Sequence, residues 1–362
     1  MRRGSARERF LLAAAVLAAG AAATRSAAQQ PARKVSPQIL REEITTELRL
    51  AVARGISYLE KRQQENGDFD REFPVAVNAL AGIALLAGGS SERAGAEHFQ
   101  MLRRATTAIL RHQNGQGYFD DGKSLMYGHG FATLYLAELY GTSDHRIEQI
   151  RTALYSAVKV IEGSQGSAGG WDYSPGPKFG GAVGPSGGSD TSITVCQTMA
   201  LRSAKGLGIL TSGDVVRRAT AYIEQAQNAD GGFRYREHGL GPYLGSSSAF
   251  PRSAAGVCIL TSLGEYSTPH VAKGFEYLRK EYRFPWSNQF PYYAHYYCAQ
   301  AMFQAGGRDW KAYFPWIRAE LVKNQQTDGS WSGSSRENDV QATAMALIIL
   351  QLPYRFLPIH ER

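Results

Sequence analysis

The chain has 362 residues, of which 43% are hydrophobic and 11% aromatic, and its formal net charge is +8. The first 28 residues hold five arginines and one glutamate, so the rest of the chain carries 35 basic and 31 acidic residues. After residue 28 no run of lysine or arginine exceeds two residues and no nucleic-acid-binding motif occurs, which argues against a nucleic-acid partner.

The N-terminus has the three parts of a secretory signal. Several arginines precede an apolar run at 10–23, and Ser26-Ala27-Ala28 follows as a small-residue cleavage site. A membrane anchor or a disordered tail is the alternative, but this run is shorter than the roughly 20 residues that span a bilayer. We predict a signal peptide at 1–28, a flexible segment at 29–36, and a periplasmic or extracellular protein without a transmembrane segment.

One short phrase recurs along the chain. A predicted helix ends in glutamine, then a glycine follows, and then an aromatic residue. The five copies are at 64–69, 113–118, 165–171, 227–233 and 325–331. Such a period is typical of an array of identical supersecondary units. The glycine suits the positive φ of a helix C-terminus, and one buried aromatic residue per unit would join neighbouring units.

Each unit pairs two helical patterns. The first is amphipathic, with one face for water; examples are 47–61, 151–161, 215–226 and 310–322. The second is apolar nearly all round and therefore buried; examples are 76–86, 131–139, 193–201, 254–263, 293–303 and 340–350. Neither terminal unit has the polar cap that an open solenoid needs. We therefore predict an all-α fold, a closed (α/α)6 toroid of six helical hairpins with a central cavity, as a single domain at 37–362.

The starts of the buried helices predict a site. Three of them open with Phe-Pro, and proline is tolerated in the first turn of a helix. Aligned on the residue after proline, the six units place these residues at equivalent positions: Val75, His129, Asp190, Arg252, Tyr292 and Asp339. Helix N-termini attract anions, so we expect this column to surround the mouth of the central cavity.

The repeated phrase resembles the QW motif of the squalene-hopene and oxidosqualene cyclases, and 325–331 is the nearest copy. The same toroid occurs in protein prenyltransferase β subunits. The resemblance, to the prenyltransferase/squalene-oxidase repeat family, covers residues 37–362. It implies a cavity that takes an isoprenoid or other lipid-like substrate, and it is more specific for the fold than for the reaction.

The catalytic motifs of that family are incomplete in this chain. Of the cyclases' D-x-D-D-T segment only Asp190 and Thr191 match, and Ser189 stands where the proton donor belongs. No Asp-x-Cys zinc pair occurs, and Asp120-Asp121 lacks the third aspartate of a magnesium-binding D-D-x-x-D run. Whether the protein is an enzyme is therefore open, and we expect no cofactor and no metal.

We assign candidate roles to seven residues. Asp190, His129 and Asp339 are the candidates for acid–base catalysis or anion binding. Arg252, Tyr292, His295 and Tyr296 are the candidates for substrate binding; Tyr292, His295 and Tyr296 share one helix face. The alternatives are helix capping by the two aspartates, an ion pair for Arg252, and plain packing for the aromatic face.

Two further features leave alternatives open. The three cysteines, Cys196, Cys258 and Cys298, lie in apolar helical runs; they are either small buried residues or a three-thiolate metal site. The glycine-rich connection 163–189 is long enough to be functional, and we expect it to cover the cavity mouth.

Three functions fit these observations. The first is an exported toroid that acts on or binds an isoprenoid or lipid-like substrate in its cavity. The second is a non-catalytic toroid that binds a lipid, a glycan or a protein. The third is a glycan-active enzyme with a carboxylate pair or a Tyr/His/Arg set.

Overall fold

A computed structural model gives the structure of the chain, and it describes residues 42–181, 189–235 and 246–360. The predicted signal peptide and the segment 29–36 lie outside the described residues. Within them, outer and inner helices alternate along the chain. The outer helices are α3 (Thr46–Arg62), α5 (Phe99–Arg111), α7 (Ile147–Gly163), α9 (Gly213–Gln225), α11 (Pro269–Glu281) and α13 (Gly307–Asn324). The inner helices are α4 (Pro74–Ala87), α6 (Leu125–Tyr140), α8 (Thr191–Gly206), α10 (Phe250–Ser262), α12 (Pro291–Ala305) and α14 (Asp339–Gln351).

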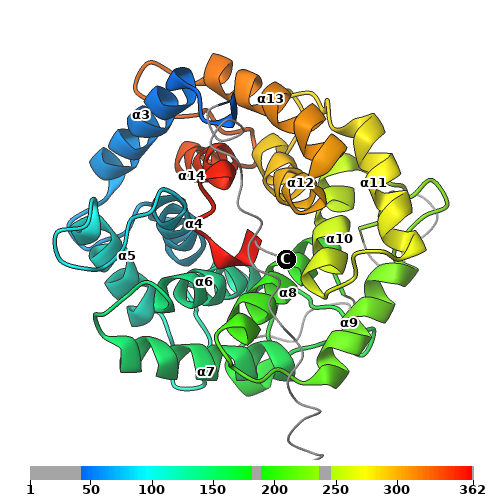
Figure 1. The fold of residues 1–362 in the computed structure, drawn as a ribbon. Coiled ribbons are helices and arrows are strands. Elements are labelled where there is room, and N and C mark those ends of the chain that lie inside the picture. The colour runs from blue at the N-terminus through cyan, green and yellow to red at the C-terminus, as the bar shows by residue number, and fades with distance from the viewer. Residues whose placement is uncertain (1–41, 182–188, 236–245, 361–362) are drawn as a thin grey trace, which may run out of the picture. The chain divides into compact units, whose positions relative to one another are not determined.

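These helices form two concentric rings (Figure 1). Each inner helix contacts the next, and α14 contacts α4, so the inner ring closes. In the outer ring α13 contacts α3. The described residues contain no named strand, only two isolated β-bridges within repeat turns. The predicted all-α toroid of six hairpins is therefore confirmed.

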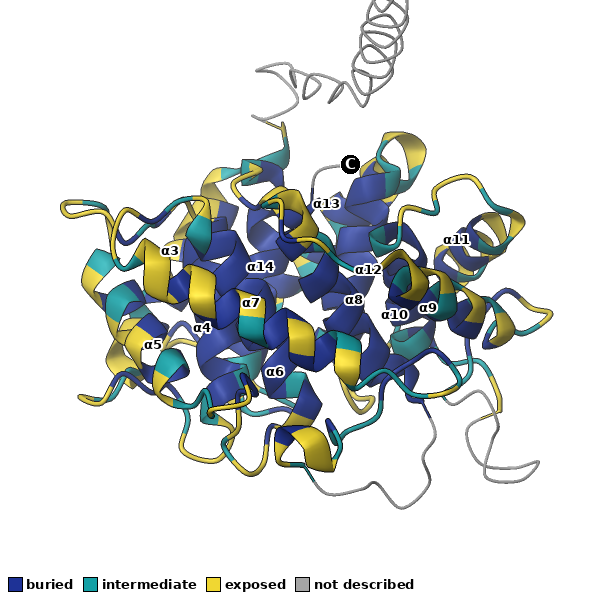
Figure 2. Ribbon diagram, turned by 90° about the horizontal axis from the view of Figure 1, so that it is seen from below, coloured by how far each residue is buried: buried dark blue, intermediate teal, exposed yellow. Residues whose placement is uncertain are grey.

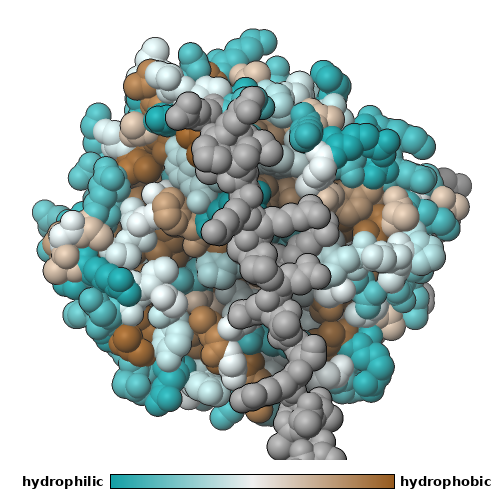
Figure 3. Space-filling view, viewed as in Figure 1, coloured by the Kyte–Doolittle hydropathy of each residue, from teal (hydrophilic) through white to brown (hydrophobic). Residues whose placement is uncertain are grey.

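Composition explains which ring each helix joins. In α4, Asn78 is the one strongly polar residue, and almost the whole helix is buried. In α5 the buried residues fall on one face, while arginines occupy the other. Figure 2 shows the result, with dark blue inner helices and yellow stripes on the outer ones. On the face seen in Figure 3, hydrophobic residues form small patches among hydrophilic ones.

The glycine of each repeated turn is required for two reasons. Gly329 has a φ of +94°, which L side chains rarely adopt, and a Cβ there would lie 2.3 Å from the Arg54 carbonyl of the next outer helix. The equivalent glycines have φ values from +88° to +100° and the same close approach to the following outer helix; they are Gly67, Gly117, Gly169 and Gly231. The glycine thus lets the backbone of each repeated turn pack directly against the following outer helix.

The repeated glutamine joins neighbouring units. In every copy its side-chain amide donates to the carbonyl of that turn glycine and to a carbonyl of the next outer helix. The glutamines are Gln63, Gln113, Gln165, Gln227 and Gln325. In the first unit this is Gln63, one residue before the copy predicted at 64–69. Gln325 of the last unit reaches the Ala51 carbonyl of the first at 2.8 Å. The same pair of hydrogen bonds therefore recurs at these five junctions, and at the junction between the last and first units it closes the ring.

The aromatic residue of each turn is fixed by its own backbone. Its N–H donates to a side chain in the second turn of the inner helix that follows. The pairs are Phe69–Asn78, Phe119–His129, Trp171–Thr194, Phe233–Ser253 and Trp331–Thr343. All five aromatic rings are buried, which supports the structural role predicted for Phe69, Trp171, Phe233 and Trp331. In the second unit the equivalent residue is Phe119 and not Tyr118, with which the predicted copy ends.

The side chains that accept these N–H groups mark the equivalent position, or column, of each unit, and they correct the alignment predicted from the sequence. His129 is equivalent to Asn78 and Thr194, one helical turn away from the position of Asp190. Arg252 precedes its column member, Ser253, by a single residue. The Phe-Pro dipeptide misleads because it enters different helices at different positions: Pro74 is the first residue of α4, whereas Pro251 is the second of α10.

Side chains fill the middle of the ring. The Phe131 and Tyr296 rings meet there with centroids 6.2 Å apart, and the Tyr297 hydroxyl lies 3.3 Å from the Cys196 sulfur. Cys258 donates instead to the Tyr297 carbonyl. No group of three metal-ligating side chains is found among the described residues. The buried Cys196 and Cys258 contact the Tyr297 hydroxyl and carbonyl, as the packing alternative expects.

The chain ends at the carboxyl ends of the inner helices. The short 3₁₀ helices η2 (Leu352–Tyr354) and η3 (Pro358–His360) follow α14, and η3 contacts α8 and α12. The Ile359 N–H donates to the buried Glu138 carboxylate of α6 at 3.3 Å. The predicted hollow hub is thus blocked in the middle and at this end, and open space remains at the amino-terminal ends of the helices.

Candidate functional site

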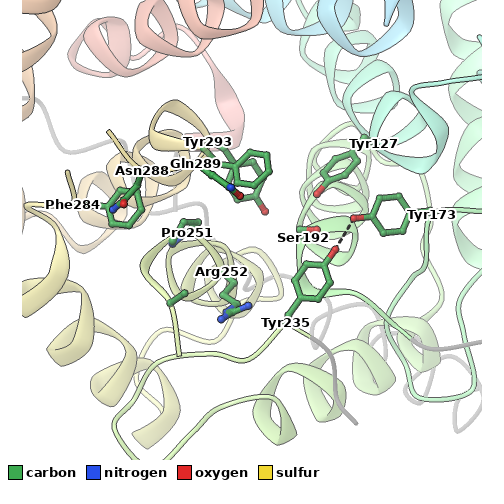
Figure 4. A pocket seen from close by; sticks show the side chains of 12 residues that line it. Tyr127, Tyr173, Ser192, Tyr235, Pro251, Arg252, Phe284, Asn288, Gln289 and Tyr293 are labelled. Atoms are coloured by element: carbon green, nitrogen blue, oxygen red, sulfur yellow. Dashed lines mark hydrogen bonds between the residues drawn. The ribbon is translucent and has the colours of Figure 1, made fainter. Parts of the chain in front are cut away.

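A pocket of about 630 Å³ lies at the amino-terminal ends of four inner helices. Helices α6, α8, α10 and α12 supply wall residues, and the loops after the turns of Trp171 and Phe233 supply two tyrosines (Figure 4). The lining residues are Tyr127, Tyr173, Ser192, Tyr235, Ala249, Pro251, Arg252, Phe284, Asn288, Gln289, Phe290 and Tyr293. The pocket therefore occupies the end of the ring that the sequence predicted, displaced toward one side.

Asp190 lies just behind this wall and is fully buried. It is the N-cap of α8: one carboxylate oxygen accepts from the Ser192 N–H at 2.7 Å and from the Ser192 hydroxyl at 2.5 Å. Burial and then the charge of this carboxylate raise the pKa of the Tyr235 hydroxyl, which lies 2.7 Å from the Tyr173 hydroxyl (Figure 4). The capping alternative for Asp190 is correct, and the cap also anchors a hydroxyl network that lines the pocket.

The hydroxyls of this network stay protonated. Burial, followed by the negative charge of Asp190, raises the pKa of Tyr235 and of Tyr173. Burial also raises the pKa of Tyr127 and Tyr293 well above the usual tyrosine value. Because an ionised tyrosine would face both a low dielectric and a carboxylate, these groups act as neutral hydrogen-bonding groups and aromatic walls.

Arg252 is the cationic side chain in the pocket wall. Its Nε is buried and has no hydrogen-bond partner, and no ion pair joins it to another described residue. Burial lowers the pKa of its guanidinium, while Tyr277, Tyr235 and Asp190 act in the opposite direction. The ion pair expected as the alternative role is not formed in this structure.

Ser189, which replaces the cyclase proton donor, does not face the pocket. It is 2% exposed, and a Cβ on Gly170 would lie 2.6 Å from the Ser189 Cβ. The position thus packs against the repeat turn at 166–170. An acid at this position would be buried behind the turn, so the structure gives no support to cyclisation by that route.

His129 and Asp339 lie away from the pocket. The His129 ring is fully buried between the Phe119 N–H and the Ala157 carbonyl, and burial lowers its pKa to about 4. Asp339 is exposed and accepts from the Gly333 N–H, while Asn338 caps α14. Neither residue joins Asp190, and their predicted catalytic roles gain no support from this geometry.

The predicted aromatic face of α12 also points away from the pocket. His295 is packed among the rings of Phe250, Trp286 and Trp316, with centroids 5.1–5.4 Å away, and burial lowers its pKa to about 3. Tyr292 packs on Trp286, and Tyr296 meets Phe131 in the middle of the ring. Both Tyr292 and His295 therefore pack against Trp286, which lies in the loop between α11 and α12.

The structure finds pocket residues that the sequence analysis missed. Tyr173 and Tyr235 follow Trp171 and Phe233 by two positions, and of the five repeated turns these two add a tyrosine there. Tyr293 is adjacent to the predicted Tyr292 but faces the pocket. Of the connection predicted to cover the mouth, Tyr173 lines the wall, and residues 182–188 lie outside the described residues.

Similar solved structures share this fold. A scan of protein-family models finds no match, and neither does a search of curated sequences. The type II terpene cyclase MstE from Scytonema, solved with geranylgeranyl dihydroxybenzoate, superposes with a TM-score of 0.56 at 14% identity, over 86% of this chain and 98% of that one. A GH76 α-mannanase from Bacteroides thetaiotaomicron gives 0.63 at 10% identity, over 88% and 99%.

A GH76 α-1,6-mannanase from Salegentibacter, solved with α-1,6-mannotriose, gives a TM-score of 0.59 at 9% identity, over 85% and 99% of the two chains. The chain has the α/α-toroid fold. The fold resembles that of terpene cyclases and of glycan-active enzymes alike, and at these identities the likeness extends to the fold alone. Within the described residues, no helix has the length and apolar character needed to cross a membrane.

Proposed function

We propose that this protein is an exported toroid that binds a lipid-like molecule of isoprenoid type in the pocket at the amino-terminal ends of α6, α8, α10 and α12. The observation that carries the proposal is the pocket wall. Six of its twelve lining residues are aromatic, and the volume of about 630 Å³ suits a small-molecule ligand. The proposal that the protein is exported rests on the signal peptide predicted at 1–28.

Aromatic walls favour an unsaturated hydrocarbon chain. Tyrosine and phenylalanine rings contribute large apolar faces, and those faces attract cations and polarisable groups. The network of Asp190, Ser192, Tyr173 and Tyr235 supplies polar groups at one wall of this otherwise apolar space. A terpene cyclase of the same fold holds a geranylgeranyl compound, which supports an isoprenoid as the ligand class.

A glycan ligand is the second candidate, because two neighbours of this fold are mannanases. Glycosidases place two carboxyl groups about 5–10 Å apart across the scissile bond. The described lining residues include no carboxylate, and Asp190 is engaged behind the wall. Glycan hydrolysis therefore has weaker support than lipid binding.

The decisive experiment compares the two ligand classes. The purified protein is titrated with geranylgeraniol and with α-1,6-mannotriose by calorimetry, and its organic extract is examined by mass spectrometry for a co-purified lipid. We expect the isoprenoid to bind and mannotriose not to bind. Replacing Tyr293 by Ala should weaken isoprenoid binding roughly tenfold, because it removes a central ring of the wall.

Replacing Tyr155 by Ala is the matched control, since that tyrosine is 47% exposed on an outer helix. The protein is also incubated with each ligand, and the same samples are then analysed by mass spectrometry for products, which report any turnover. Binding of mannotriose without binding of the isoprenoid would contradict the proposal and favour the glycan alternative.

A further inference from the structure

The pocket wall contains one cationic side chain that no described residue pairs directly. Arg252 is the second residue after the Phe250 start of α10, and its guanidinium lies at the pocket across from Tyr235 (Figure 4). No hydrogen bond or ion pair joins it to another residue in the described part of the chain, and its Nε is buried. The side chain as a whole is half-buried, but a buried N–H without an acceptor is unfavourable, and a ligand group in the pocket would supply that acceptor.

We infer that the ligand carries a single carboxylate group that pairs with Arg252, and this inference rests on the proposed function. The guanidinium presents parallel N–H groups that match a planar carboxylate. Arg252 supplies the only cationic side chain among the described lining residues, so the wall offers one positive charge. The apolar part of the ligand would then lie against the aromatic rings.

Among the described residues, the position of Asp190 disfavours more highly charged ligands. The buried Asp190 carboxylate lies behind the same wall and attracts Arg252 through space. A diphosphate would bring several negative charges toward this carboxylate, and no cluster of three metal ligands exists among the described residues to hold a compensating cation. A neutral hydrocarbon would leave the buried Nε of Arg252 without an acceptor. A single carboxylate supplies that acceptor while adding the smallest negative charge near Asp190.

The test uses three probes with the same hydrocarbon chain: geranylgeranoic acid, geranylgeraniol and geranylgeranyl diphosphate. Their dissociation constants are measured by calorimetry for the wild-type chain, for Arg252→Met, and for Arg308→Met as a control. Arg308 is 82% exposed at its side chain. In the wild type we expect the acid to bind at least tenfold more tightly than the alcohol and the diphosphate. Arg252→Met should abolish this preference, and Arg308→Met should keep it.

Folding of the variant is checked by its circular dichroism and its melting temperature. Arg252→Lys separates charge from geometry, because lysine keeps the charge without the paired N–H groups; we expect it to retain part of the preference. Equal binding of acid and alcohol, tightest binding of the diphosphate, or equal weakening of all probes by Arg252→Met would overturn the inference while the proposed function stands. Binding of none of the three would overturn the proposed function itself.

Discussion

His129 shows how a reactive residue type is used for structure. Its ring accepts the Phe119 N–H at the place where the other units use Asn78, Thr194, Ser253 and Thr343. Gly128 and Gly130 flank His129 in the sequence. A Cβ on Gly130 would lie 2.7 Å from the Cys196 Cβ, so this glycine allows close packing of α6 against α8. Residue type alone did not reveal this, because the partner lies on another helix.

The burial of His129 predicts acid sensitivity. Its pKa falls from 6.5 to about 4 on folding, so the unfolded chain binds more protons between these values and stability decreases as the pH falls through that window. Between pH 7.5 and pH 5 this group costs about 2 kcal/mol. His129→Asn, which copies Asn78, should lose that part of the pH dependence in urea unfolding. The exposed His145→Asn is the control, and identical slopes for wild type and His129→Asn would contradict the argument.

The turn glycines predict a second single-residue effect. Gly329→Ala must accept a φ of +94° and a Cβ 2.3 Å from the Arg54 carbonyl, so we expect a loss of about 1–3 kcal/mol in the free energy of unfolding. Gly213→Ala is the matched control, because no atom lies within 4 Å of its Cβ and it starts α9. A melting temperature of Gly329→Ala equal to that of the control would show that the turn relaxes.

At the scale of one element, α8 combines a cap and a pocket wall. Asp190→Ala removes the cap and should cost about 0.5–2 kcal/mol in urea unfolding. Asp190→Asn keeps an acceptor for the Ser192 N–H but removes the charge, so it should leave stability within about 0.5 kcal/mol. If the charge holds the tyrosine hydroxyls in place, Asp190→Asn should still weaken binding of the pocket ligand severalfold. Unchanged binding in both variants would reduce Asp190 to a cap.

The helices themselves were largely predictable, and their starts were not. The predicted run 193–201 lies within α8, but 131–139 misses the first six residues of α6. Periodicity reports burial, and it is interrupted where glycines allow close approach, as at Gly128 and Gly130. The pocket residues were therefore the least well predicted, because they lie in these first helical turns. A shift of one residue in α12 exchanges Tyr292, which packs on Trp286, for Tyr293, which lines the wall.

At the scale of the whole molecule, closure was predicted from the absence of polar caps, and the structure shows what performs it. Five of the six junctions join units that follow each other along the chain. The sixth joins α13 to α3, at opposite ends of the described ring. Its contacts include Gln325, which donates to the Gly329 and Ala51 carbonyls and accepts from Arg54. Trp310 and Arg318 of α13 add hydrogen bonds to residues 42–43, just before α3. The contacts of Gln325 are the same set that Gln165 makes inside the chain with Gly169, Val215 and Arg218.

The two glutamines therefore test the role of chain continuity. Each variant, Gln325→Ala and Gln165→Ala, loses equivalent hydrogen bonds worth about 0.5–1.5 kcal/mol each. At the seam no continuous chain links α3 to α13, so the loss should appear as local opening of 46–62, with exchange about tenfold faster for each 1.4 kcal/mol. In Gln165→Ala the flanking helices remain enclosed by units on both sides, and their amides should open only with the whole fold. Hydrogen–deuterium exchange measures both, and equal local opening in the two variants would show that the seam is no weaker than the other junctions.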